Sequence, residues 1–281
     1  MRFSPAAAIQ FALPQKLLCR IIYYLARSRQ RWLRSLLVGV FMQLYTIDLS
    51  EAEVESAAGY SNFNEFFTRA LKPGARPLEG DEQTVVSPVD GRLTEFGRLS
   101  ADRLMQAKGM SYTLKSLLRE RAELLEPFHG GHFMTVYLAP HNYHRVHTPL
   151  AGQLERGRYI PGKRFSVNQK TVAAIDGLFS RNERAALWLS TEKGYCAVVM
   201  IGALNVASLS TILSGEIPPG PERLLSPETP QLLARGDELG RFNLGSTIVM
   251  LFPRGAIRWN AALRPGQTVR MGQALGRCEA R

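Results

Sequence analysis

Three of the five histidines in the chain fall within residues 140–149 (PHNYHRVHTP). Histidine titrates near neutral pH, so such a cluster serves proton transfer or metal binding, unless its members are structural or surface residues. His141, His144 and His147 recur at every third position, but prolines bracket the stretch. We therefore expect an irregular loop that leads into a strand. No carboxylate or cysteine stands at ligand spacing here, and we predict no metal site.

An aspartate and a serine far from this stretch are the other candidates for chemistry. Asp90 directly precedes a glycine, a pattern that above all predicts a turn. Ser246 follows Gly245 at the head of an apolar run, where a serine is usually an ordinary strand start. The surrounding residues are not Gly-x-Ser-x-Gly, so the nucleophile elbow of the α/β-hydrolases is absent.

The N-terminal residues are expected to form helices. Residues 1–47 contain seven basic side chains and no acidic one, mixed with many large apolar side chains. This mixture is typical of helices that lie in a membrane interface, although a basic helix packed on the domain is the alternative. Apolar residues recur at helical spacing in two sets: Leu17, Leu18, Ile21, Ile22 and Leu25, then Leu33, Leu36, Leu37 and Val40.

No apolar run approaches the roughly 20 residues that a membrane-spanning helix needs. The first dozen residues faintly resemble a signal peptide, but Pro14 and Lys16 interrupt them and no clean cleavage site follows. We therefore predict a peripheral protein that is not exported. Three widely spaced cysteines favour neither a disulfide framework nor a zinc site, which points to a reducing cytoplasm.

The rest of the chain divides into further helices and a long series of strands. Ser50, with Glu53 three residues on, predicts a third helix, and Asn62 or Asn64 a short one that carries Phe66 and Phe67. After residues 72–74 the pattern becomes short and β-branched, with strands expected at 133–138, 196–201, 206–209 and 247–252 and a helix around 113–120. We predict an α+β fold, with a helical membrane-associating segment (residues 1–75) on a mainly β catalytic domain (residues 76–281).

The formal net charge of +11 calls for a polyanionic partner, either a nucleic acid or an anionic membrane. In residues 1–47 the basic side chains are mixed with large aliphatic ones and are not spread over a polar face. This arrangement disfavours nucleic acid as the partner.

Six segments in chain order resemble motifs of the phosphatidylserine decarboxylase family. Each segment is weak alone, but six in the right order are specific, and together they extend along almost the whole chain. No lipid-binding or calcium-binding domain is appended, as in the short bacterial form of the family. The segments are residues 66–77 (FFTRALKPGARP), 87–91 (SPVDG), 108–114 (KGMSYTL), 143–149 (YHRVHTP), 161–168 (PGKRFSVN) and 244–247 (LGST).

This resemblance implies a precursor that cleaves itself. Asp90, His147 and Ser246 would form a charge-relay triad, and the serine would attack the carbonyl of Gly245. The products would be a chain of residues 1–245 and a chain of residues 246–281. Ser246 would become a pyruvoyl group, the covalent cofactor, whose carbonyl forms a Schiff base with the substrate amine.

The resemblance also assigns the substrate and the remaining site residues. Phosphatidylserine in an anionic membrane would lose carbon dioxide and become phosphatidylethanolamine, with His144 protonating the α-carbon. The substrate-binding loop would comprise Phe165, Ser166, Val167 and Asn168. The family implies a homodimer, and we expect a peripheral protein on the cytoplasmic side of the bacterial cell membrane.

Two other functions fit the same residues. A serine hydrolase would use Ser246, His147 and Asp90 on an external substrate and would keep its chain intact. A non-enzymatic basic adaptor would bind the membrane and use the β segments only as a scaffold.

Overall fold

The computed structural model describes most of the chain, with the side chains of Lys16 and Ser246 left out. The predicted features that therefore lie outside it are the signal-like first residues, with the basic Arg2 among them, Lys108 of the 108–114 motif, the start of the strand expected at 206–209, and Gly245. The described ranges are residues 14–107, 109–204, 208–227, 229–244 and 246–279.

Two amphipathic helices form the N-terminal part, α2 (Gln15–Arg27) and α3 (Arg31–Leu44). Each leaves part of its apolar surface exposed, including Leu17 and Ile21 on α2 and Leu36 on α3. The helices therefore do not use their whole apolar face to pack on the protein. No helix in the described ranges is long and apolar enough to cross a membrane.

The short helix α4 (Phe63–Phe67) confirms the prediction made from the two asparagines. The side chain of Asn62 caps it by accepting a hydrogen bond from the backbone N–H of Glu65 (3.0 Å). Its aromatic residues are buried and pack with α2 and α3 in a small core of their own.

The prediction of a helix that starts at Ser50 is wrong. The Asp48 carboxylate instead accepts hydrogen bonds from the backbone N–H (2.8 Å) and the hydroxyl (2.6 Å) of Ser50, which forms a local turn. The residues that follow pair with a distant segment, because the N–H of Glu53 donates to the carbonyl of Ala70 and the N–H of Lys72 to the carbonyl of Glu51. These backbone groups are not available for a helix.

From residue 84 onward the chain is mainly β, with short helices inserted. The helices are α5 (Leu114–Leu118), α6 (Ala122–Leu125), α7 (Gln169–Val172) and α8 (Leu178–Arg181). The strands are β1 (Thr84–Val86), β2 (Gly91–Arg98), β3 (Arg103–Ala107), β4 (Met110–Thr113), β5 (His132–Leu138), β6 (Arg145–His147), β7 (Gly152–Ile160), β8 (Arg184–Thr191), β9 (Gly194–Gly202), β10 (Ser208–Thr211), β11 (Gly215–Ile217), β12 (Arg223–Leu225), β13 (Gln231–Leu233), β14 (Glu238–Asn243), β15 (Ser246–Phe252), β16 (Ile257–Trp259), β17 (Thr268–Val269) and β18 (Ala274–Cys278).

The largest sheet has the strand order β12-β7-β8-β9-β15-β5-β2-β17, with β13 also paired to β7. A four-stranded sheet, β11-β10-β14-β6, forms a second layer, and β1-β18-β16 and β3-β4 are smaller sheets. All pairs between these strands are antiparallel. The central strands are covered on both faces, so β9 and β15 read as continuous apolar runs rather than as an alternating pattern.

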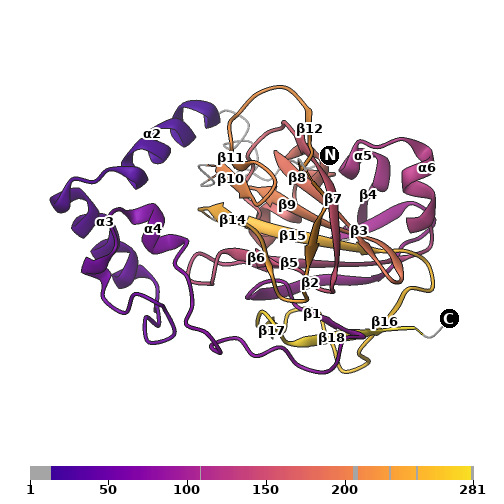
Figure 1. Ribbon diagram of the computed structural model, residues 1–281. Helices are drawn as coiled ribbons and strands as arrows, with labels where there is room; N and C mark the ends of the chain where they lie inside the picture. The colour runs from indigo at the N-terminus through magenta and orange to yellow at the C-terminus, as the bar shows by residue number, and fades with distance from the viewer. Residues whose placement is uncertain (1–13, 108, 205–207, 228, 245, 280–281) are drawn as a thin grey trace.

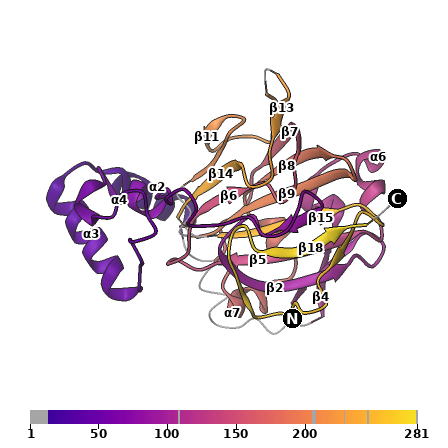
Figure 2. The same cartoon turned by 60° about the horizontal axis from the view of Figure 1, so that its bottom comes forward.

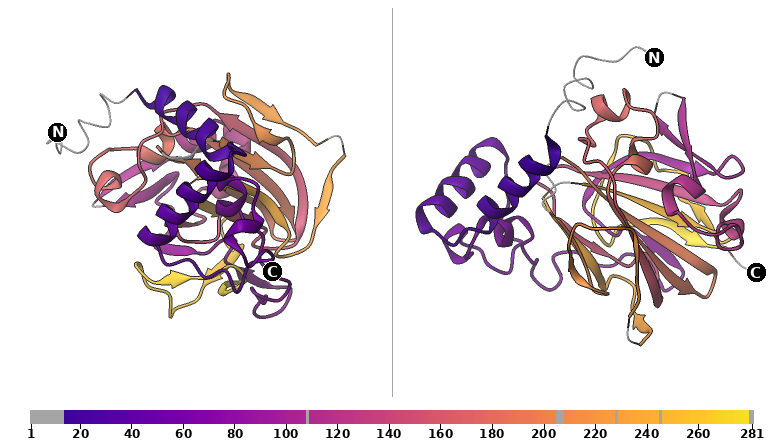
Figure 3. Two further views of the ribbon diagram at one scale, coloured as in Figure 1. Left: turned by 90° about the vertical axis from the view of Figure 1, so that its left-hand side faces the viewer. Right: turned by 90° about the horizontal axis from the view of Figure 1, so that it is seen from above.

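The helical part and the β part lie side by side and have separate cores. In Figure 1, α2, α3 and α4 stand at one end of the sheets, and α5 and α6 lie at the opposite end. Figure 2 and the right-hand view of Figure 3 show that the same three helices project from the β part. Leu244, next to the predicted cleavage point, packs into the core of the helical part and not into that of the sheets.

Candidate active site

The predicted cleavage point lies where the chain passes from one sheet to the other. β14 ends at Asn243 in the four-stranded sheet, and β15 begins at Ser246 in the middle of the large sheet. Ser246 pairs with Leu138 of β5 on one side and with Gly202 of β9 on the other. Because both flanking strands are paired independently, a break between them leaves each strand held in its sheet.

Leu244 adopts a backbone conformation that costs energy. Its φ angle is +88°, in the left-handed region that side chains other than glycine rarely occupy. Residues held in such conformations cost about 1–3 kcal/mol each and persist only where packing enforces them. The buried Leu244 side chain supplies that packing through its contacts in the cluster of Phe63, Phe66 and Phe67. Leu244, one residue upstream of Gly245 and the predicted scissile bond, is thus both strained and anchored.

The connection between β5 and β6 passes around this point. It starts at Leu138, the partner of Ser246, and its first turn is closed by two hydrogen bonds between Ala139 and Asn142 (2.7 and 2.9 Å). It then returns to β14, where the N–H of Phe242 donates to the carbonyl of His144 (3.0 Å). The predicted irregular loop leading into a strand is confirmed: the loop carries His141 and His144, and the strand β6 carries His147.

His144 is fully buried and stacks on Phe67, with 4.0 Å between the ring centroids. Its Nε2 is 3.2 Å from the carbonyl of Pro140, and since a carbonyl can only accept, Nε2 carries the hydrogen. Nδ1 is then a lone-pair acceptor, and it is buried without a partner in the described residues. Burial lowers the pKa of His144 to about 3, so the ring is neutral.

This buried histidine makes stability dependent on pH. The folded-state pKa lies near 3 and the unfolded value near 6.5, so stability is complete above pH 6.5 and falls as the pH drops below it. One such histidine costs up to about 1.4 kcal/mol per pH unit. In uncleavable protein, urea unfolding at pH 7.5, 6.5 and 5.5 should show this slope, and His144→Phe should reduce it. His129→Gln, at an exposed position, is the control; an unchanged slope in His144→Phe would contradict the assignment.

His147 is held by a different pair of groups. Its Nδ1 donates to the carbonyl of Gly236 (2.8 Å), which leaves Nε2 to accept from the hydroxyl of Tyr143 (3.0 Å). Burial lowers the pKa of His147, and the Gly236 bond and the charges of Glu238 and Asp90 partly oppose this. The tautomer therefore places the basic nitrogen at Nε2.

Asp90 is buried and saturated by other partners. Arg76 binds its carboxylate through Nε (3.0 Å) and Nη2 (2.7 Å), and the backbone N–H of Met271 donates to Oδ1 (2.8 Å). Arg76 also pairs with Glu51 (2.8 Å), and the two carboxylates raise the pKa of its guanidinium. Within the described residues, no hydrogen bond joins Asp90 to His147.

The predicted site residues are therefore brought together only in part. The backbone N–H of His147 donates to the carbonyl of Pro88 (2.9 Å), which places His147 beside the segment that carries Asp90. Along β14, His147 is opposite Glu238, whereas His144 is opposite Phe242. Of the two histidines, His144 is nearer to the Asn243 end of β14, where the cleavage segment begins.

The predicted substrate loop is tied to the residue opposite Ser246. Asn182 accepts from the N–H of Phe165 (3.0 Å) and donates to the carbonyls of Phe165 and Gly202 (both 2.8 Å). Gly202 is the β9 partner of Ser246. Val167 is buried like Phe165, and the Ser166 and Asn168 side chains are hydrogen-bonded to each other (2.9 Å).

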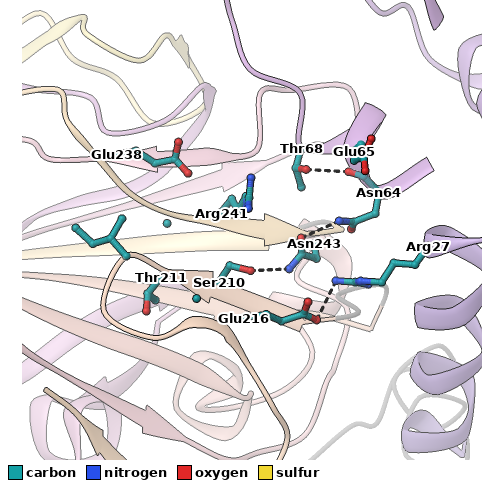
Figure 4. Close-up of a pocket in the computed structure, with 13 residues that line it drawn as sticks. Arg27, Asn64, Glu65, Thr68, Ser210, Thr211, Glu216, Glu238, Arg241 and Asn243 are labelled. Carbon is teal, nitrogen blue, oxygen red and sulfur yellow. Dashed lines mark hydrogen bonds and ion pairs between the residues drawn. The ribbon is translucent and has the colours of Figure 1, made fainter. Parts of the chain in front are cut away.

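A polar cavity of about 500 Å³ lies beside the same turn, between α2, α4 and the outer face of the four-stranded sheet (Figure 4). At one end Asn64 donates to Asn243 (3.1 Å), and Asn243 donates to Ser210 (3.0 Å). Arg27 closes the helix side by pairing with Glu216 (2.9 Å). None of the predicted catalytic residues lines this cavity.

Four groups that position the site were not singled out in the sequence. Arg76 and Tyr143 stand inside two of the quoted motifs, so the motifs carried a signal for them. Asn182 and the carbonyl of Gly236 lie outside every motif, and no pattern in the sequence marks them. Their roles depend on long-range contacts with Phe165 and His147.

Comparisons with known proteins show the family of this chain. A sequence model of the family described as phosphatidylserine decarboxylase matches residues 63–277, and a shorter one described as PSD matches residues 5–46. The chain is 44% identical over 273 residues to the phosphatidylserine decarboxylase proenzyme of Alcanivorax borkumensis, covering 95% of this chain and 94% of that protein. It is 46% identical over 276 residues to the proenzyme of Ectopseudomonas mendocina, covering 96% of each chain.

These matches define a decarboxylase of phospholipid metabolism that is made as a proenzyme. The chain belongs to the phosphatidylserine decarboxylase family. The family converts phosphatidylserine to phosphatidylethanolamine after autocatalytic cleavage. The α+β fold and the family predicted from the sequence are confirmed.

Proposed function

We propose that this chain cleaves itself between Gly245 and Ser246 and that residue 246 becomes a pyruvoyl group, which then serves the decarboxylation of phosphatidylserine. One observation carries the proposal besides family membership. The bond lies one residue beyond Leu244, whose φ of +88° places a strained turn between two independently paired strands. Cleavage relieves that turn, whereas β14 and β15 keep their partners. The test is the mass of the small chain, which should be lighter than residues 246–281 by one ammonia.

The cleavage chemistry needs a base for the serine hydroxyl. Ser246 Oγ attacks the Gly245 carbonyl, the peptide C–N bond breaks, and the nitrogen of residue 246 takes the proton, leaving an ester. Removal of the Ser246 α-proton then expels the Gly245 carboxylate and leaves dehydroalanine. Water converts this to the pyruvoyl group and ammonia.

We assign the role of the base to His147. The carbonyl of Gly236 fixes the tautomer in which Nε2 accepts a proton. The Asp90 charge favours the imidazolium that forms. Tyr143 occupies Nε2 in the uncleaved chain, so its hydroxyl must give way or remain in the path of the proton.

The surroundings of residue 246 fit a pyruvoyl group. Thr247 and Ile248, which follow it on β15, are buried. The loop after Leu138, the β5 partner of Ser246, carries His144, whose buried Nδ1 has no partner in the described residues. A pyruvoyl group supplies an electron sink for the carbanion left by loss of carbon dioxide. His144 protonates the substrate α-carbon in this proposal, because an anionic substrate beside it raises its pKa and lets it carry a proton.

The loop at Phe165, Ser166, Val167 and Asn168 is the proposed substrate-binding segment. Its link through Asn182 to Gly202 holds it against the strand that pairs with Ser246. Helix α2 also reaches it, because Gln15 accepts from the N–H of Arg164 (3.0 Å). The substrate would thus lie between the helical part and the large sheet.

The helical part is the proposed membrane contact, on the cytoplasmic side of a bacterial membrane. Its exposed apolar side chains include Trp32 (67% exposed) and Leu36 (54%) on α3, beside the exposed Arg31. Apolar side chains flanked by basic ones insert shallowly into an anionic interface.

The double variant Trp32→Glu, Leu36→Glu should therefore weaken binding to vesicles that contain phosphatidylserine. Burying each side chain contributes about 1.5–3 kcal/mol, so the loss for the two together should reach about 100-fold or more in a flotation assay. Leu232→Glu on β13, where the leucine is 84% exposed, is the matched control. If both variants bind vesicles like the wild type, the helices are not the membrane contact.

The partners proposed for this protein are the two cleavage products and a second copy. The 1–245 and 246–281 chains should remain associated, because β15 pairs with β5 and β9 along its length. The homodimer follows from the family resemblance, and light scattering of the cleaved protein tests it.

A further inference from the structure

Arg69 is a buried cation without a partner to match it. Three arginines in the described ranges are at least nine-tenths buried: Arg69 (5% exposed), Arg184 (1%) and Arg235 (9%). The other two each donate to three backbone carbonyls. Arg184 donates to those of Leu117, Asn182 and Ser116. Arg235 donates to those of Glu79, Thr84 and Gly80.

The contacts of Arg69 are much poorer. Its Nη2 makes one long contact to the carbonyl of His141 (3.4 Å), and Nε and Nη1 are enclosed with no hydrogen-bond partner among the residues that the structure describes. The guanidinium carbon lies 6.0 Å from the centre of the Phe66 ring. None of the ion pairs in the described residues includes Arg69.

The nearby carboxylates do not compensate this charge. Asp90 and Glu51 attract Arg69 only at longer range, and both are already hydrogen-bonded to Arg76, which repels it. Burial lowers the pKa of Arg69, as expected of a cation with no fixed counter-ion. An arginine keeps its charge at neutral pH, so an uncompensated one inside a protein is costly and calls for an anion.

Arg69 lies beside the proposed reaction centre. Its contact residue His141 belongs to the loop that begins at the partner strand of Ser246, and its charge acts on His144. Phe66, whose ring it faces, packs in the same cluster as Leu244. An anion on Arg69 would thus be adjacent to His144 and to the cleavage turn.

We propose that Arg69 is the anion-binding residue of the substrate site and that it takes the phosphodiester of the lipid headgroup. This inference rests on the proposed function, which supplies phosphatidylserine as the ligand. The phosphodiester is unchanged from substrate to product, so binding it does not oppose the reaction. A cation bound to the substrate carboxylate would stabilise the charge that decarboxylation must remove, and would raise the barrier.

The site is closed in the uncleaved chain, because two of the three guanidinium nitrogens are enclosed. The cut at Gly245 frees Leu244 from its covalent link to β15, and Leu244 packs in the cluster that contains Phe66. In this proposal, the lipid headgroup therefore reaches Arg69 only after cleavage.

The main experiment compares two substrates on the cleaved enzyme and its Arg69→Gln variant. Dihexanoyl phosphatidylserine carries the phosphodiester, whereas O-octyl-L-serine keeps the amine and carboxylate but lacks it. We expect kcat/KM for the phospholipid to fall about 10- to 100-fold, mostly through KM, because a charge-assisted bond is lost. Turnover of O-octyl-L-serine should be unchanged.

Each other outcome has a definite meaning. Equal losses on both substrates overturn the proposal in favour of the substrate carboxylate or the new Gly245 carboxylate. Unchanged activity on the phospholipid also overturns it. Wild-type enzyme that turns over neither substrate would instead refute the proposed function, which separates the two failures.

A stability measurement excludes a merely structural role. In the uncleavable Ser246→Ala background, Arg69→Met should raise the unfolding temperature, because it removes a buried charge that nothing compensates. Arg184→Met is the matched control and should lower it, because three carbonyls then lose their donor. A lower unfolding temperature for Arg69→Met would show that the precursor itself satisfies Arg69, contrary to the proposal.

Discussion

Ser246→Ala should accumulate as a single uncleaved chain of 31.3 kDa with no decarboxylase activity. The variant lacks both the nucleophile for cleavage and the atoms from which the pyruvoyl group is made. Removing the nucleophile of a comparable triad slows the reaction by about 10³-fold or more. The variant should still fold, because the residue opens a strand that is fixed by backbone pairing to β5 and β9. A denaturing gel and intact mass of fresh and aged protein measure the result.

The adjacent hydroxyl provides the control. Thr247 is buried, and its Oγ1 has no partner in the described residues, so Thr247→Val removes a hydroxyl at nearly constant shape. This variant should cleave at a rate close to that of the wild type. Cleavage that persists in Ser246→Ala but stops in Thr247→Val would transfer the nucleophile to position 247. An active wild type that remains intact would instead support a serine hydrolase.

The sequence was sufficient to predict those elements whose signal comes from residues close together in the chain. The apolar spacing of residues 17–40 predicted α2 and α3, and Asn62 predicted the start of α4, because helix faces and caps depend on neighbours in the chain. The predicted helix at Ser50 failed for the opposite reason. Its backbone groups pair with residues 70–72, and a distant pairing leaves no periodic signal.

The candidate site was predicted as residue types but not as an arrangement. The motifs marked Asp90, His144, His147 and Ser246, yet not that Gly236 orients His147 or that Arg76 holds Asp90. A backbone carbonyl has no sequence signature at all. Likewise, the strain at Leu244 depends on packing against the helical part, which no pattern around residues 244–247 encodes.

Arg76 is a buried charge near the site and should contribute strongly to stability. It joins Asp90 and Glu51, with 9% of its own side chain exposed and 10% and 28% of theirs. Removing one member of a buried ion pair typically costs about 3–5 kcal/mol, because the remaining charge stays buried and unpaired. We expect Arg76→Met to lower the free energy of unfolding by about this amount in urea titrations of uncleavable protein.

The same variant should also slow self-cleavage, and the reason is positional. Asp90 receives Arg76 on one side and the N–H of Met271 on the other, so Arg76 holds the carboxylate through which the future 1–245 chain contacts the future 246–281 chain. Arg277→Met is the control, because Arg277 forms an ion pair with Asp81 that is 57% exposed on both sides and such pairs contribute little. Arg76→Lys keeps the charge but loses the two-point geometry, and should cleave faster than Arg76→Met and slower than the wild type. Arg76→Met could instead match Arg277→Met in both stability and cleavage rate. In that case Arg76 does not hold the carboxylate of Asp90. The position of this carboxylate relative to His147 must then be set by the backbone of residues 88–91 alone.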